Sequence, residues 1–182
     1  MSNKNLTKMD LNAVVGFATV LTAINGMGKI AANPSDPAHS PQIGFFCFFV
    51  LLRFKMFIDD EDHNFRVDDP VGNTCAVVSW ILFLFSASTI SVDLHASISW
   101  FMWAIAVSTL WVVNSLFKAY MSGSNIRKYF VYLLFNVFYL LLLFLLDPEF
   151  PRLGFDWGEL SGWAFIIPCL VVLMEWVLSN RH

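Results

Sequence analysis

Long apolar stretches alternate with short polar ones along the whole chain. Most of these stretches have 18 or more residues. A helix rises about 1.5 Å per residue, so about 20 residues cross the roughly 30 Å hydrocarbon core of a bilayer. The sequence therefore predicts an all-α, polytopic membrane bundle with six transmembrane helices, at residues 11–31, 42–58, 75–93, 97–118, 128–146 and 160–178.

The first two stretches are the weakest of the six. Residues 42–58 include Arg53 and Lys55, whose long aliphatic stems could let the charges reach the headgroups while the helix spans. Residues 11–31 follow a basic segment, as the apolar region of a signal peptide does. However, Asp10 interrupts that segment and no small-residue cleavage site follows, so we expect a retained first membrane helix. If neither stretch spans, four transmembrane helices remain.

Composition favours the bilayer as the main partner of this chain. The residues are 57% hydrophobic and only 14% charged, whereas soluble domains are nearer a quarter charged. The net charge of -3 argues against nucleic acid, which requires clustered Lys and Arg. The three cysteines fit neither a disulfide framework nor a zinc motif, and we interpret them as small apolar residues: Cys47, Cys75 and Cys169.

The basic residues predict an orientation. If the N-terminus is cytoplasmic and all six stretches cross, nine Lys and Arg residues fall inside and two, Lys29 and Arg152, fall outside. This split follows the positive-inside rule. We therefore expect a single multi-pass membrane domain over residues 1–182 in a bacterial inner membrane, with both termini cytoplasmic and an acidic cytoplasmic loop at residues 59–74.

A polar stripe follows one face of the fifth stretch, formed by Tyr129, Tyr132, Asn136 and Tyr139. In lipid, such a face turns inward, where hydroxyl and amide groups bond across helices. The stripe could line a watery path or could only pack helices together. Packing is favoured because this pattern is general in membrane bundles. We also expect the chain to form a homo-oligomer.

Glu175 is the only carboxylate well inside an apolar stretch. An ionisable residue at such a depth predicts a functional role or a charged partner. Arg53 lies at a similar predicted depth, so the sequence predicts an intramembrane pair between Arg53 and Glu175. A proton or cation site is the alternative. The pair is favoured because no second intramembrane carboxylate is present to continue a relay.

The stretch after Lys55 is strongly acidic. Three interpretations are open: a surface that docks a basic cytosolic protein, a weakly specified cation site, or a solvated charge run. The spacing matches no calcium-binding loop, and the sequence leaves open whether the stretch binds a metal. The residues in question are Asp59, Asp60, Glu61, Asp62, His63, Asp68 and Asp69.

The sequence contains no recognisable catalytic grouping. It has no nucleophile elbow, phosphate-binding loop, zinc-protease motif or dinucleotide fingerprint. We therefore expect neither an enzyme nor a cofactor. The favoured function is a membrane-embedded interaction, sensor or anchor subunit for a soluble cytoplasmic partner, as found in bacterial defence or stress systems. The alternative is an oligomeric ion channel or a pore-forming membrane effector.

Overall fold

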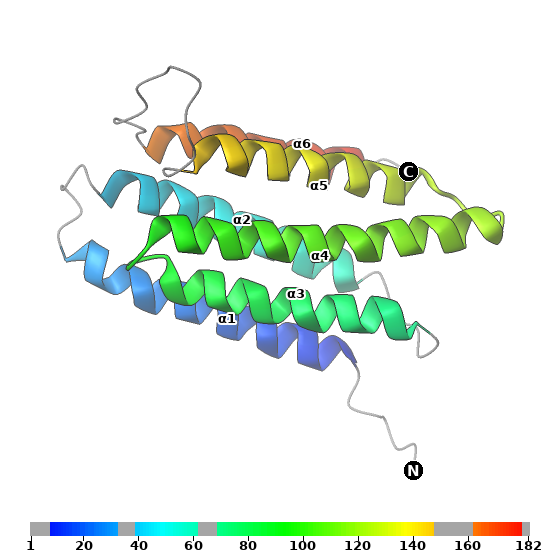
Figure 1. The fold of residues 1–182 in the computed structure, drawn as a ribbon, viewed down its shortest axis with the longest axis horizontal. Coiled ribbons are helices and arrows are strands. Elements are labelled where there is room, and N and C mark those ends of the chain that lie inside the picture. The colour runs from blue at the N-terminus through cyan, green and yellow to red at the C-terminus, as the bar shows by residue number, and fades with distance from the viewer. Residues whose placement is uncertain (1–7, 33–38, 62–68, 148–161, 180–182) are drawn as a thin grey trace, which may run out of the picture.

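A computed structural model of the chain describes residues 8–32, 39–61, 69–147 and 162–179. The described residues form six α-helices and one short 3-10 helix, with no strand among them (Figure 1). The prediction of an all-helical chain is confirmed. In chain order the elements are α1 (Lys8–Ala31), α2 (Ser40–Glu61), α3 (Pro70–Thr89), α4 (Leu94–Met121), α5 (Arg127–Leu146), η2 (Gly162–Phe165) and α6 (Ile166–Ser179).

The helices lie side by side along one common axis (Figure 1). Packing neighbours follow the order α1, α3, α4, α5, α6 and α2, and α2 returns to α1, so the bundle is closed. Successive helices alternate in direction. The end of α2, the start of α3 and the end of α4 therefore lie at the same end of the bundle, which we call the acidic end (Figure 1).

Three of the helices, α3, α4 and α5, are long and apolar enough to cross a membrane. Two further helices carry shorter apolar stretches, Val14–Gly28 in α1 and Trp163–Ser179 across η2 and α6. Three candidate spans are compatible with a membrane protein. The full set of six spans stays a prediction.

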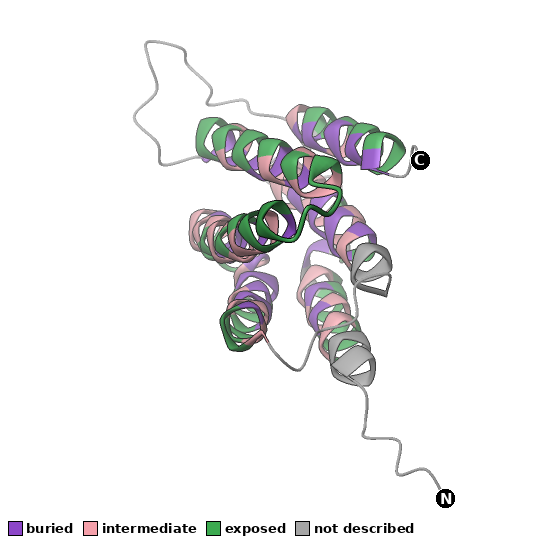
Figure 2. Cartoon of the chain, turned by 90° about the vertical axis from the view of Figure 1, so that its right-hand side faces the viewer, coloured by how far each residue is buried: buried purple, intermediate pink, exposed green. Residues whose placement is uncertain are grey.

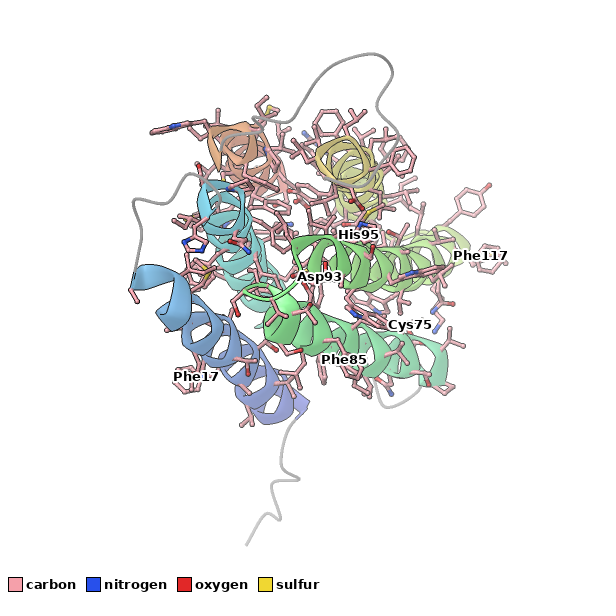
Figure 3. All side chains as sticks on the ribbon, turned by 60° about the vertical axis from the view of Figure 1, so that its left-hand side comes forward. Phe17, Cys75, Phe85, Asp93, His95 and Phe117 are labelled. Atoms are coloured by element: carbon pink, nitrogen blue, oxygen red, sulfur yellow. The ribbon has the colours of Figure 1, made fainter. Side chains whose placement is uncertain are left out.

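The outer faces of the helices are strongly apolar. Buried faces turn toward the middle of the bundle and exposed faces turn away from it (Figure 2). Phe17 and Phe117 project outward, with 67% and 63% of their surface exposed (Figure 3). Exposed apolar side chains recur along α3, α5 and α6 as well. In water this much contiguous apolar surface would promote association, whereas in a bilayer it contacts lipid.

Rings from five elements fill the bundle in the half away from the acidic end. We call them the aromatic cluster, and all are fully buried. Their centroids lie 5.1 to 6.3 Å apart in tilted and edge-on arrangements, the range in which aromatic pairs attract. The cluster consists of Phe45, Phe48, Phe49, Phe83, Phe101, Tyr139 and Phe165.

The connection between α2 and α3 is shorter than the sequence predicts. Helix α2 continues to Glu61, and α3 already begins at Pro70. Both ends of the predicted 59–74 loop are therefore helical. The reason for the early start of α3 is local: Asp69 caps the helix, and Pro70 occupies its first turn, where a missing N–H costs nothing.

Candidate functional site

A buried ion pair joins α2 and α6 inside the bundle. The Lys55 ammonium contacts Oε1 of Glu175, and Tyr139 of α5 donates its hydroxyl proton to Oε2 over 2.6 Å. Lys55 and Glu175 are 5% and 2% exposed. Charges so far from solvent are tolerated only when they are paired and hydrogen-bonded, and both conditions hold here.

Helical spacing places Glu175 on the inner face of α6. That face also carries Pro168, Val171, Val172 and Ser179, which recur at intervals of three and four residues and are all buried. The structure therefore buries the Glu175 carboxylate inside the bundle, and its depth in a membrane stays a prediction. Its burial follows from the position of α6 against α2 and α5.

The predicted ionic partner of Glu175 was wrong by two positions along α2. The structure pairs Glu175 with Lys55, whereas the Arg53 guanidinium lies 4.5 Å from the ring centroid of Phe83 in α3. An Arg53 amino group also contacts Met56 Sδ at 3.9 Å. Residues two apart on a helix differ little in depth, but they point about 200° apart. Depth alone could not choose between them.

The contacts of the buried aromatic residues of α2 show which face of the helix each cation shares. Lys55 follows Phe48 by seven residues, and Phe48 packs on Tyr139 at 5.9 Å. Arg53 follows Phe49 by four residues, and Phe49 packs on Phe83 at 6.3 Å. Lys55 therefore shares the face of α2 that meets α5, and Arg53 shares the face that meets α3.

Both cations of α2 are buried in the bundle, whereas the sequence analysis expected their side chains to extend outward. Arg53 is 4% exposed, and its guanidinium is near α1, because a Cβ added at Gly16 would lie 3.7 Å from an Arg53 nitrogen. The Lys55 ammonium lies 4.6 Å from the ring centroid of Tyr132. Helix α2 packs against α1 and α6, and its cations are covered by the bundle.

A cavity of about 80 Å³ adjoins these charges, on the acidic-end side of the aromatic cluster. We call it the charged cavity. Its walls combine two cations, one carboxylate, polar groups and several large apolar side chains from five helices. The lining residues are Arg53, Lys55, Met56, Ala76, Ser79, Trp80, Phe83, Ser108, Trp111, Val112, Tyr132, Asn136 and Glu175.

The polar stripe of α5 faces the interior, as predicted. Tyr132 and Asn136 line the charged cavity, Tyr139 is fully buried and holds Glu175, and Tyr129 is half-buried. The Tyr139 ring belongs to the aromatic cluster while its hydroxyl belongs to the ion pair. This division suits a side chain with an apolar body and a polar tip.

Hydroxyl pairs join α3 to α4. Ser79 and Ser108 are 2.8 Å apart, and Ser86 and Ser97 are 3.2 Å apart. Each of the latter two also donates to the backbone carbonyl of the other, at 2.8 and 2.7 Å. Small hydroxyl residues permit this close approach of two helices, which is the packing role expected for such residues in membrane bundles.

Asp69 is fixed at the start of α3. Its carboxylate accepts the Gly72 N–H at 2.9 Å, contacts the Lys118 ammonium at 2.8 Å, and accepts from Asn114 at 3.3 Å. Partial burial by itself raises the pKa of Asp69. Lys118, the Gly72 N–H and Asn114 outweigh it, so the pKa lies below its ordinary value.

These contacts give Asp69 a structural role that the sequence analysis missed when it grouped Asp69 with the docking candidates. Of the other candidates, Asp59, Asp60 and Glu61 end α2, and their side chains are outside the described part of the chain. Asp62, His63 and Asp68 also lie outside the described residues. Within the described part, no three His, Cys, Asp or Glu side chains are grouped as metal ligands would be.

A second interhelical pair, which the sequence analysis did not predict, lies at the opposite end of the bundle. His95 Nδ1 of α4 and Asp147 Oδ1, directly after α5, are 2.6 Å apart. His95 lies in the first turn of α4, beside its cap residue Asp93 (Figure 3). Both residues belonged to predicted loops, where single-sequence reasoning gives no contact between distant segments.

No known protein family, curated protein or solved structure matches this chain.

Proposed function

We propose that the chain is a multi-pass protein of a bacterial inner membrane, with six transmembrane helices and both termini in the cytoplasm. Three candidate spans, the apolar outer faces of the bundle and the nine-to-two split of basic residues support this topology. In this orientation the acidic end of the bundle faces the cytoplasm.

The function that this arrangement supports best is that of a non-enzymatic interaction, sensor or anchor subunit. The acidic segment, residues 59–68, recruits a soluble basic partner, and the helices hold that partner at the membrane. Defence and stress systems in bacteria are one setting for such a subunit. Asp69 is excluded from the docking surface because it caps α3 and pairs with Lys118.

The position of the aromatic cluster is the observation that carries this proposal. The three cluster members on α2, Phe45, Phe48 and Phe49, precede Lys55 by about two to three turns, on the side opposite the acidic end. A polar path that entered through the charged cavity would therefore end against packed rings. An interaction role needs no path through the bundle, whereas conduction through a single chain does.

An oligomeric channel or pore-forming effector is the second candidate. The charged cavity and the inward polar stripe of α5 favour it, because both place polar groups inside the bundle. Conduction would then require rearrangement of the aromatic cluster or a lumen between copies of the chain.

The interaction subunit and the channel can be distinguished by comparing how two variants of equal net charge recruit soluble proteins. In the test variant, Asp59, Asp60, Glu61 and Asp62 become Asn or Gln. In the control, four carboxylates from the segments that the proposal places outside are neutralised instead: Asp36, Glu149, Asp156 and Glu159. Both changes remove four negative charges from the chain.

The full-length variants are used for pull-down of cytosolic proteins at two salt concentrations, beside ion-flux measurements in liposomes. We expect the wild type and the control to recruit the partner, with weaker recruitment at higher salt, because exposed charges are screened beyond about 8–10 Å. The test variant should recruit none. Unchanged recruitment by the test variant, or robust flux from the purified wild type alone, would favour the channel.

A further inference from the structure

We propose that two copies of the chain associate through the outer face of α1, with Asn25 of one copy hydrogen-bonded to Asn25 of the other. The inference rests on α1 crossing the bilayer, which is part of the proposed function, and it does not depend on the docking role of the acidic segment. Helix α1 packs against α2 and α3. Its remaining surface faces away from the bundle, as the outward ring of Phe17 shows (Figure 3).

The outward surface of α1 carries one regular stripe, which we call the α1 seam. Its members are exposed and follow one another at alternating steps of four and three residues: Val14, Ala18, Leu21, Asn25 and Gly28. At about 100° per residue, this spacing keeps all of them within about 80° of one another. Such steps are typical of the seam along which two helices pack. The α1 seam therefore has the form of a helix-packing surface.

Asn25 is the member of the α1 seam that lipid cannot satisfy. Its side chain is exposed, and no other described residue hydrogen-bonds to it. Exposed hydroxyls behave differently, because Thr22 donates to the Ala18 carbonyl and Ser88 donates to the Phe85 carbonyl, each at 2.8 Å. Those hydroxyls are satisfied within their own helix. The Asn25 amide keeps both its donors and its acceptor for a partner outside this chain.

The depth of Asn25 makes such a partner necessary. Helix α1 has 24 residues, or about 36 Å, and Asn25 lies about 8 Å from its midpoint. Half of the hydrocarbon core is about 15 Å thick, so Asn25 lies inside it when α1 spans the bilayer. Acyl chains neither donate nor accept hydrogen bonds, and an unpaired amide among them is costly. A second helix with a polar group at the same depth removes this cost.

A second copy of the chain is the partner that fits this geometry. Copies inserted with the same charge bias share one orientation, so two α1 helices meet in parallel around a twofold axis along the membrane normal. A residue at that axis faces its own counterpart, and Asn25 therefore meets Asn25 at one depth. A carboxamide both donates and accepts, so the two side chains are complementary to each other.

Small residues on the α1 seam permit the close approach that this hydrogen bond requires. Ala18 and Gly28 lie on either side of Asn25, seven residues before it and three after it. A Cβ added at Gly28 would have nothing within 4 Å, so the bundle leaves open space beside this position. Small residues are enriched where membrane helices meet, because they let the backbones come close together.

Disulfide cross-linking in membranes of the expressing cells tests the interface. In the full-length chain without its native cysteines, the seam variants are Ala18→Cys, Leu21→Cys and Gly28→Cys, and copper phenanthroline is the oxidant. We expect a product of twice the chain mass from each of them. Leu134→Cys and Leu141→Cys on α5 are matched controls, because these leucines are 58% and 55% exposed and Leu21 is 48% exposed. The controls should give only background cross-linking.

Substitution of Asn25 tests the hydrogen bond itself. Sedimentation equilibrium of the full-length protein in neutral detergent micelles measures the affinity of the dimer. Asn25→Leu should weaken it roughly three- to thirtyfold, the effect of one polar contact between membrane helices. Asn25→Gln keeps an amide on the seam and should lose less. Ser88→Ala removes an exposed hydroxyl that is satisfied within α3 and should leave the affinity within about twofold.

The outcomes separate the interface from the topology. Equal cross-linking of Leu21→Cys and Leu141→Cys, or products at other masses alone, would contradict the dimer, as would an unchanged affinity in Asn25→Leu. Reaction of Leu21→Cys with an impermeant thiol reagent in opened membranes would contradict both the dimer and the crossing of α1. If Leu21→Cys is shielded from that reagent and forms no disulfide, α1 still crosses the bilayer and the dimer alone is wrong.

Discussion

Replacing one partner of the buried Lys55–Glu175 ion pair should destabilise the bundle more than replacing both partners. In Lys55→Met, the Glu175 carboxylate keeps its charge at 2% exposure without its ammonium. In Glu175→Leu, the buried Lys55 ammonium is left without its carboxylate. Removal of one partner of a buried pair costs about 3–5 kcal/mol, because an uncompensated charge stays in a poor solvent. Neither group is exposed enough for water to screen this cost appreciably.

The double variant Lys55→Met/Glu175→Leu should behave differently. Replacing both charges by apolar groups of similar size is often close to neutral. The Tyr139 hydroxyl loses its acceptor on Glu175, which costs about 1–3 kcal/mol. The two single variants together should then lose about 6–10 kcal/mol, against about 1–3 kcal/mol for the double variant. The expected coupling is at least about 3 kcal/mol.

Reversible unfolding in mixed micelles, followed by tryptophan fluorescence, measures these free energies. A parallel cycle with Arg53→Met serves as the control, because Arg53 points toward Phe83 and lies on the other face of α2. Its coupling to Glu175 should be smaller than that of Lys55. Simple addition in the Lys55 cycle, or a larger coupling in the Arg53 cycle, would refute the assignment of the pair.

Further predictions concern the start of α3 and its contact with α4. A Cβ added at Gly72 would lie 2.5 Å from Asp69 Oδ2 and 2.8 Å from Trp111 Cδ1, so Gly72→Ala should cost about 1–3 kcal/mol in an unfolding assay. Gly28→Ala, with nothing within 4 Å, should instead stabilise α1 by up to about 1 kcal/mol. The pKa of Asp69 is lowered in the folded state, so its stabilising contribution is present above about pH 4 and is lost as the pH falls through the folded pKa. The stability difference between wild type and Asp69→Asn should therefore shrink below pH 4, and a difference that persists there would contradict the role of Lys118.

Helix positions were predictable from the sequence because hydrophobic length is a local property. All six predicted stretches correspond to helices in the structure. Residues 59–61 and 70–74 were assigned to a loop because acidic residues obscured the end of α2 and the cap at Asp69. Trp111 lies within an apolar stretch whose pattern names no partner for it, and in the structure its ring contacts the first turn of α3 at Gly72.

Which residues are buried at the site was easier to predict than which of them contact one another. The sequence predicted that Glu175 needs a partner and that the stripe of Tyr132, Asn136 and Tyr139 faces inward, and each of these residues is buried. The choice of Lys55 as partner depends on which face of α2 meets α5 and α6. The packing of the helices around the bundle decides this, and helical periodicity within one segment does not predict which neighbours each face meets.

Cysteine labelling on the two sides of the membrane tests the proposed topology most directly, because the cytoplasmic position of the acidic end depends on it. In a background without Cys47, Cys75 and Cys169, single cysteines are placed at Ser35 and at Asn125. The proposal predicts that an impermeant reagent outside intact cells labels position 35 and leaves position 125 unlabelled until the membrane is opened. Labelling of position 35 only after opening, or of position 125 in intact cells, would contradict the six-helix arrangement and the cytoplasmic acidic segment.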